Sequence, residues 1–229
     1  MGIFNKKPDQ SVVDALTESI IDLFDTMGGD PSDAIRAAKG HSSVRDWRTW
    51  QAIQVTSTGA LAALVPGAHV PALIADAAFL MNRMAHCSWG IGGALGARVD
   101  GKYDLAQIMG HWAGATTRQA IGSGLQALAL GTGLGGLISL DDIAFGFTGN
   151  AGTGMLSVIG VHPDVAIIGG VLLKKGAAKL AVKLAGKMGA GFIPLVGAGI
   201  CATINNVIIN GIADSAVTYY EEKRKHFPE

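Results

Sequence analysis

Asp76 is the carboxylate with the most unusual surroundings in this sequence. It lies in residues 72–79, Ala-Leu-Ile-Ala-Asp-Ala-Ala-Phe, where all its neighbours are apolar. A buried carboxylate is costly unless it is paired or hydrogen-bonded, so Asp76 requires a partner or a place at the edge of the fold. A structural contact with Arg83 or with a helix N-terminus is one interpretation. A ligand or proton site is the other.

Three asparagines raise the same question, because they interrupt an otherwise apolar run: Asn205, Asn206 and Asn210. Asn206 and Asn210 are one helical turn apart and can share a face. Hydrogen bonds between helices are the favoured interpretation, and a polar lining for a ligand cavity is the second. With Asp76, these asparagines form the set of candidate polar core or ligand contacts.

The other motifs for catalysis or cofactor binding are incomplete. Residues 131–136, Gly-Thr-Gly-Leu-Gly-Gly, fit the dinucleotide pattern, but a helix end precedes them and no acid follows at the required distance. A glycine turn between helices explains them better. The six histidines lack metal-ligand spacing, and neither a Walker A motif nor a nucleophile elbow is present. We therefore predict no cofactor, no metal and no catalytic residue, and favour a non-enzymatic role.

Three lysines recur at every fourth position in an amphipathic segment over residues 164–187: Lys179, Lys183 and Lys187. Apolar side chains lie beside them, namely Leu180, Val182 and Leu184. Such a stripe is typical of a solvated helix face or of a membrane surface. If the protein binds lipid, we expect this stripe to face the membrane.

The helices that position these residues are indicated by apolar spacing and by glycine and proline punctuation. An acidic helical hairpin over residues 1–40 differs in composition from the remaining domain, residues 41–229, and is either a separate arm or the outermost layer of the fold. Its helices are expected from Asp9 to Met27 and from Pro31 to Lys39. A third helix is expected from Ser42 or Ser43 to Val65, and a fourth from Pro71 to the glycines at 90–96. Another helix is expected to begin after a cap at Asp104, and a further one to cover 164–187.

Small residues dominate the composition. The chain has 33 glycines in 229 residues, about twice the usual share, and only 16% charged residues. Small side chains let helix backbones approach closely. We therefore predict an all-α fold, a compact multi-helix bundle of closely packed Gly/Ala-rich helices with little or no sheet. Gly197 and Gly199 are expected at one such close crossing.

Long segments carry no charge at all, namely residues 119–140, 143–161 and 188–213. Each is long enough to span a bilayer, which needs about 20 apolar residues. Glycine, proline and asparagine interrupt them, which favours buried core helices. Membrane insertion, constitutive or triggered, is the alternative.

Charge and cysteine content narrow the class of protein. The formal net charge is zero and basic residues are not densely clustered, so nucleic acid is not an expected partner. Two cysteines form no disulfide framework, and the first residues lack the apolar core of a signal peptide. A cytoplasmic location is therefore expected. The tail, residues 219–229, reads as a solvated end.

Two parts of the chain resemble the EcsC family. Residues 192–199, Phe-Ile-Pro-Leu-Val-Gly-Ala-Gly, followed by Ala202, Asn205 and the run 213–220, look like its C-terminal signature. The proline-glycine turn at 65–67, with Ala75-Asp76, Gly90 to Gly96 and Asp104, is similar to its central part. The resemblance covers residues 50–220, apart from a long glycine-rich loop at 146–154.

This resemblance implies a bacterial, helical, membrane-associated protein without established catalytic residues. It favours a non-enzymatic protein, peripheral to the membrane or conditionally inserted in it, that acts through membrane lipid or a membrane protein. A conditional membrane-inserting or pore-forming effector is the alternative. An enzyme with a site near Asp76 is a further one. Self-association to a homo-oligomer stays open.

Overall fold

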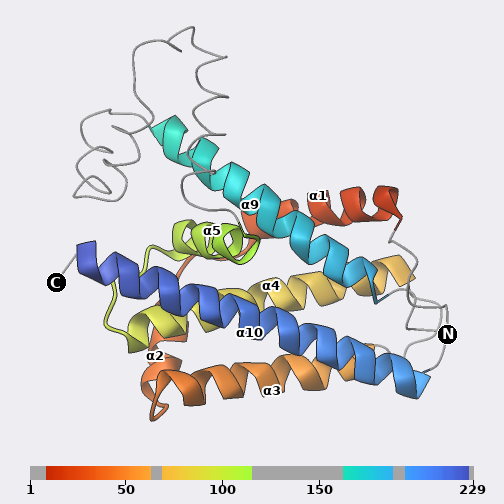
Figure 1. The fold of residues 1–229 in the computed structure, drawn as a ribbon, viewed down its shortest axis with the longest axis horizontal. Coiled ribbons are helices and arrows are strands. Elements are labelled where there is room, and N and C mark those ends of the chain that lie inside the picture. The colour runs from red at the N-terminus through yellow and green to blue at the C-terminus, as the bar shows by residue number, and fades with distance from the viewer. Residues whose placement is uncertain (1–8, 63–68, 115–161, 188–193, 227–229) are drawn as a thin grey trace, which may run out of the picture.

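The computed structural model describes residues 9–62, 69–114, 162–187 and 194–226 of the chain (Figure 1). These residues form helices and contain no β-strand, which confirms the predicted all-α fold. The glycine motif at 131–136 and the charge-free segments 119–140 and 143–161 lie outside the described residues. The described helices are α1 (Gln10–Thr26), α2 (Ser32–Lys39), α3 (Val44–Ala62), α4 (His69–Ala94), α5 (Gly101–Trp112), α9 (His162–Ala185) and α10 (Pro194–His226).

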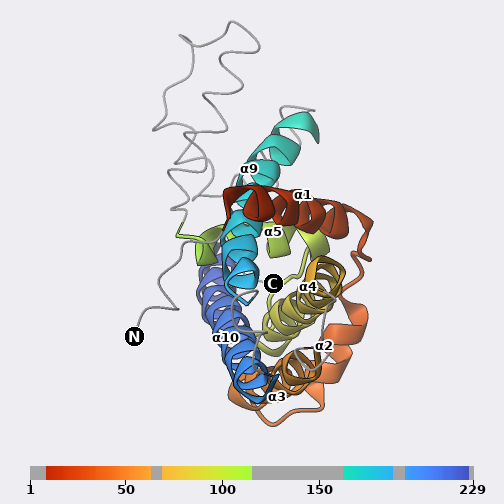
Figure 2. The ribbon, with the colours of Figure 1, turned by 90° about the vertical axis from the view of Figure 1, so that its right-hand side faces the viewer.

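Helices α1 and α2 cover the bundle as an outer layer. Asp9 caps α1 by accepting a hydrogen bond from the Ser11 backbone N–H. The buried face of α1 packs against α9 and α4, and α2 packs against α4. Figure 2 shows α1 crossing α9. One face of α1 is apolar and belongs to the same buried core as the later helices, through Val13, Leu16, Ile20 and Phe24. The acidic hairpin is therefore a layer of the fold, with its carboxylates on the outside.

Three long helices, α3, α4 and α10, lie side by side, with α3 along the lower edge of the molecule in Figure 1. α10 runs antiparallel to α3, because Arg48 pairs with Asp214 while the Asn205 side chain contacts the Val55 carbonyl oxygen. α5 and α9 pack against each other, and α5 also contacts α10. As a result, the end of α3, the start of α4, the end of α9 and the start of α10 meet at one end of the bundle, on the right in Figure 1.

Glycines on one helix make room for large side chains of another. A Cβ at Gly90 of α4 would lie 2.4 Å from the indole nitrogen of Trp47, which donates a hydrogen bond to the Cys87 carbonyl. A Cβ at Gly211 of α10 would lie 2.5 Å from the indole nitrogen of Trp112. Equally tight approaches of 2.5–2.7 Å occur at Gly92, Gly93, Gly110 and Gly176. At these six positions, close packing rather than a special backbone conformation accounts for glycine.

The described residues show no close crossing at Gly199. Gly199 is exposed, and no described heavy atom lies within 4 Å of a Cβ built on it. Gly197 is outside the residues whose surroundings the structure describes. Glycine-rich sequence shows that helices can approach closely, but it does not show which glycines face a neighbour. In this bundle the close approaches lie in α4, α5 and α9 and in the middle of α10.

We expect Gly90→Ala to lower the free energy of unfolding by about 1–3 kcal/mol, because the added methyl group overpacks the Trp47 ring. Gly199→Ala is the matched control within a helix. It meets open space and gains up to about 1 kcal/mol of helix propensity. Urea denaturation of both variants measures the difference. Equal stability of the two variants would show that the Trp47 contact is not tight.

Candidate functional site

A buried polar cluster lies between α3, α4 and α10, next to the end of α9. The Lys187 ammonium pairs with the Asp76 carboxylate and donates a hydrogen bond to the Asn205 side-chain oxygen. The Asn205 side-chain nitrogen donates to the Val55 carbonyl oxygen at 3.1 Å and to Asp76 Oδ1 at 3.5 Å. All three side chains are buried, with exposed fractions of 9% for Asp76, 5% for Lys187 and 0% for Asn205. We call these residues, with the Val55 carbonyl, the Asp76 cluster.

The cluster joins elements that are distant in sequence. Asp76 comes from the first half of α4, Lys187 follows the end of α9, Asn205 comes from α10 and Val55 from α3. The sequence required a partner for Asp76, and the structure supplies Lys187. The suggested partner Arg83 instead donates to the Gln54 side-chain oxygen. Because the carboxylate, ammonium and amide satisfy one another, the cluster has the character of a structural tie.

Asn206 and Asn210 do not belong to this cluster. They share a face, as their spacing indicated, and Asn210 donates to the Asn206 side-chain oxygen at 2.9 Å. That face points outwards, with Asn206 exposed and Asn210 half-buried. The described contacts therefore do not place these two side chains in the polar core. Only Asn205, one position away from Asn206, points between the helices.

The lysine stripe does not form a continuous membrane-facing surface. Lys187 is buried in the Asp76 cluster, and the Lys179 ammonium lies 4.4 Å from the centre of the Trp112 ring. Lys183 is partly exposed. The apolar side chains expected beside the stripe are divided as well, since Leu180 and Leu184 are fully buried and only Val182 is exposed. Two of the three lysines are therefore turned towards the bundle, and Lys187 lies beyond the end of α9 at Ala185.

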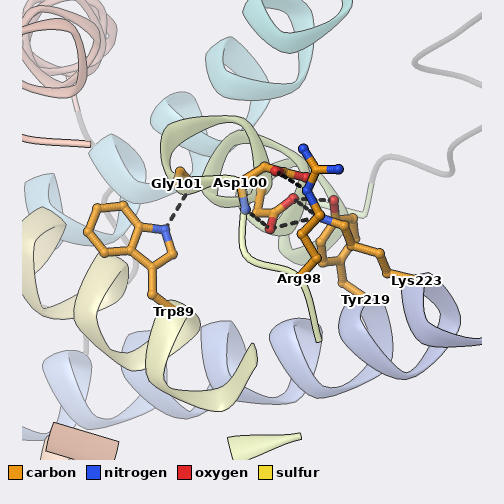
Figure 3. Close-up of polar contacts among 7 residues, drawn as sticks. Trp89, Arg98, Asp100, Gly101, Tyr219 and Lys223 are labelled. Carbon is orange, nitrogen blue, oxygen red and sulfur yellow. Dashed lines mark hydrogen bonds and ion pairs between the residues drawn. The ribbon is translucent and has the colours of Figure 1, made fainter. Parts of the chain in front are cut away.

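A second polar cluster joins the start of α5 to the end of α10 (Figure 3). Asp104, which is fully buried, accepts hydrogen bonds from the Tyr219 hydroxyl at 2.6 Å and from the Lys223 ammonium at 2.7 Å. Lys223 also contacts Asp100 Oδ2 at 2.8 Å, and Arg98 Nε contacts Asp100 Oδ1 at 3.0 Å. Two cations therefore balance two carboxylates. We call these five residues the Asp104 cluster.

Sequence reasoning missed this second cluster. Asp104 was expected to cap a helix. It does accept the Asp100 backbone N–H at 2.8 Å, but it lies inside the first turn of α5, with Asp100 at the cap position. The tail was expected to be a solvated end, yet the Lys223 side chain is only 12% exposed. The spacing of Tyr219 and Lys223, one helical turn apart, was the available signal, because such residues share a face.

The turn before α5 is held from its other side by Trp89. Its indole nitrogen donates to the Gly101 carbonyl oxygen at 2.9 Å, as Figure 3 shows. Gly101 adopts a positive φ of 51°, and a Cβ there would lie 2.3 Å from the Gly29 carbonyl oxygen. Glycine is therefore required at this position by both conformation and space.

The Asp104 cluster perturbs the titration of its members. Burial favours neutral Asp100, but the hydrogen bond and charge of Lys223, with Arg98, outweigh burial and hold its pKa below the ordinary value. Burial, reinforced by the charges of Asp104 and Asp100, raises the pKa of Tyr103 to about 12. Burial and the nearby Asp104 charge raise the pKa values of Tyr219 and Tyr220 well above 10. A tyrosine with a raised pKa is a poor general base near neutral pH.

All three tyrosines of the chain are expected to resist ionisation while the fold is intact. Because their folded pKa values are raised, their contribution to stability is present below about pH 10 and is lost as pH rises through the folded values. Tyrosinate absorbance and helical circular dichroism should therefore change together in an alkaline titration. A tyrosine that ionises reversibly near its ordinary pKa with helicity preserved would contradict this prediction.

Lys223→Met should lower the free energy of unfolding by about 3–5 kcal/mol, since it leaves buried Asp104 without its cation. Lys225→Met is the matched control, because Lys225 is exposed on the same helix. The effect should shrink in acid, where protonation of Asp100 removes the stability that its lowered pKa provides. Urea denaturation of both variants at neutral and acidic pH tests this. Equal loss in the two variants would show that Asp104 does not depend on Lys223.

The described residues thus define an all-α helical protein in which the two polar clusters act as ties between helices. They contain no group of three His, Cys, Asp or Glu side chains placed to hold a metal ion. One helix, Gly199–Lys225, is long and apolar enough to cross a membrane by length and composition, and the core helix of a soluble protein would meet the same criteria. No family model matches the chain, and no curated protein or solved structure matches it either.

Proposed function

We propose that this chain is a non-enzymatic, membrane-associated protein, similar to EcsC proteins, that contacts lipid through one end of its helical bundle. The observation that carries this proposal is the distribution of charge. Residues 49–75 and 188–213 contain no Asp, Glu, Lys or Arg. The first segment includes most of α3 and the start of α4, and the second includes the first half of α10. We call the part of the bundle that these segments build the charge-free end.

The charged residues that flank the two segments pair with one another. Arg48 precedes the first segment and pairs with Asp214, which follows the second. Asp76 follows the first segment and pairs with Lys187, which precedes the second. The two ion pairs therefore flank the two segments in the sequence, and in space Arg83 of α4 also contacts Gln54 within the first segment. Paired flanking charges suit a membrane surface, because charges are costly in hydrocarbon and uncharged segments are not.

The charge-free end also carries most of the large exposed apolar side chains among the described residues. Trp50 and Ile53 of α3, Ile74 of α4 and Val207 of α10 lie in the two segments, whereas Val182 of α9 lies outside them. Trp50 is the tryptophan suited to an interface, being 48% exposed, whereas Trp47, Trp89 and Trp112 are buried.

Vesicle co-sedimentation tests the proposal. Wild-type protein should bind phosphatidylcholine vesicles, with or without added anionic lipid, and added salt should have little effect because no charge attraction is required. Binding should quench Trp50 when the lipid chains are brominated. Sedimentation without quenching would place the contact elsewhere, and no binding to any vesicle would contradict lipid contact.

The double variant Ile53→Glu/Val207→Glu should weaken vesicle binding by at least about tenfold, because each carboxylate adds a cost in the apolar phase. Thr218→Glu is the matched control. Thr218 is also exposed on α10, but it lies beyond Asp214 and outside the charge-free end. Equal binding by the double variant and the control would reject this end as the contact surface.

Conditional insertion is the second candidate function, and the incomplete burial of α10 favours it. Only 44% of the apolar window in Gly199–Lys225 is buried inside the bundle. The helix is thus long enough to span a bilayer and is only partly enclosed by protein. In this form of the proposal, peripheral binding precedes the release of α10 into lipid. Vesicle leakage caused by the bound protein would separate insertion from peripheral binding.

A further inference from the structure

We propose that Arg83, with Asn82 and His86 beside it on α4, forms a binding site for a phosphate monoester. The Arg83 guanidinium donates two hydrogen bonds, one from Nη1 to the Gln54 side-chain oxygen and one from Nη2 to Asn82 Oδ1 at 3.3 Å. Both acceptors are neutral amides. Among the described residues, no carboxylate forms an ion pair with Arg83, although its side chain is half-buried.

This cation differs from the lysines of the two polar clusters, because Lys187 and Lys223 are each paired with a carboxylate. Burial acts on the Arg83 guanidinium without such compensation and holds its pKa below the ordinary value. Its Nε atom is buried and has no hydrogen-bond partner among the described residues. A partly desolvated cation without a counter-ion is costly, and a bound anion would reduce that cost. The guanidinium is therefore one half of an ion pair whose other half a ligand can supply.

The neighbouring side chains select the kind of anion. His86 follows Arg83 by one helical turn, and burial together with the Arg83 charge holds its pKa below the ordinary value. An anion beside Arg83 would offset that charge and favour protonated His86. Asp33 of α2, the acidic group among the described residues that acts on His86, is exposed and pairs with Arg36, so it leaves the site open to a ligand.

The donors at the site match the oxygens of a phosphate monoester. Arg83 has five N–H groups, of which the two hydrogen bonds use two, and the exposed Asn82 amide can donate to the same ligand as Arg83. A phosphate monoester carries about −1.5 to −2 charge near neutral pH and three free oxygens. It can therefore meet Arg83, protonated His86 and Asn82 together. A carboxylate has one charge and two oxygens, so it would leave one of these groups without a partner.

The site lies beside the part of α3 that carries Trp50. Gln54, which accepts from Arg83, is one helical turn beyond Trp50 on that helix. In the proposed membrane contact, Trp50 lies in the interface, where the headgroup phosphates also lie. The headgroup of phosphatidic acid is a phosphate monoester, and a free phosphate ester has the same chemistry. Lipid as the source of the ligand rests on the proposed function, whereas the site itself does not.

Stability measurements separate a ligand site from a structural contact between α3 and α4. Without ligand, Arg83→Gln should unfold at the same urea concentration as wild type or at a higher one, because it removes an uncompensated cation. Glycerol 3-phosphate should raise the unfolding midpoint of wild type and not that of Arg83→Gln, since a ligand stabilises the folded state that binds it. A less stable Arg83→Gln variant with an unchanged response to glycerol 3-phosphate would show a structural contact and overturn the site.

Vesicle co-sedimentation tests the lipid as the source. Phosphatidylcholine vesicles contain either phosphatidic acid or phosphatidylglycerol, a phosphate diester, with the zeta potentials of the two preparations matched. Wild-type protein should bind the phosphatidic acid vesicles at least about tenfold more tightly, as charge-assisted hydrogen bonds would provide. In Arg83→Gln the two affinities should become equal. Arg45→Gln is the matched control, because Arg45 is exposed on α3, and it should keep the preference.

Calorimetric titration of the free protein with glycerol 3-phosphate tests the site without lipid. Binding that depends on Arg83 and not on Arg45, with no binding to any vesicle, would keep the site and reject lipid contact. A preference for phosphatidic acid that depends on Arg83, without binding of glycerol 3-phosphate, would identify the lipid headgroup as the ligand. Vesicle binding without that preference, and without binding of glycerol 3-phosphate, would keep lipid contact and overturn the site. A preference that persists in Arg83→Gln, or that Arg45→Gln loses equally, would overturn the site as well.

Discussion

Close approach of helix backbones is the constraint on which this bundle depends. With glycine and alanine so frequent, each helix offers little side-chain surface, so burial must come from short distances between axes. The tight sites pair a glycine with a large partner, such as Gly90 with Trp47 and Gly211 with Trp112. Each ring lies directly against a helix backbone and fills the space that small residues leave. The same arrangement makes the contact intolerant of a single added methyl group.

Small-residue contacts hold helices close but specify their register weakly, because one alanine or glycine resembles the next. The two polar clusters supply what those contacts lack. In the first half of α10, Asn205 meets Lys187 and Asp76, and near its C-terminal end, Tyr219 and Lys223 meet Asp104. A slip of α10 by one turn would therefore separate Asn205 from Lys187 and Asp76, and would leave Asp104 without its cation. Directional, buried interactions thus set the position of the longest helix.

The sequence predicted the parts of this structure that depend on local pattern. The apolar spacing of α1, the restart of α2 after proline and the need of Asp76 for a partner all follow from neighbouring residues. The identity of that partner does not, because Lys187 is 111 positions away and its period-four spacing fits an outward face equally well. Asp104 and Lys223 are likewise far apart in the sequence, being separated by 119 positions. The faces of α9 and α10 were also ambiguous, since helices that are apolar on most sides do not show in their sequence which side is buried.

The placement of charge links this packing to the proposed membrane contact. A soluble bundle gains nothing from excluding every charge from two segments of adjacent helices, because exposed positions such as Ile53, Ser57 and Thr203 tolerate charged residues without loss of packing. Charged residues are absent even from these exposed positions. The charged residues that flank the segments form ion pairs, Arg48 with Asp214 and Lys187 with Asp76. A surface that meets hydrocarbon accounts for both features, since a charge is costly there whether it faces the core or the outside. In water the same surface is an aggregation liability.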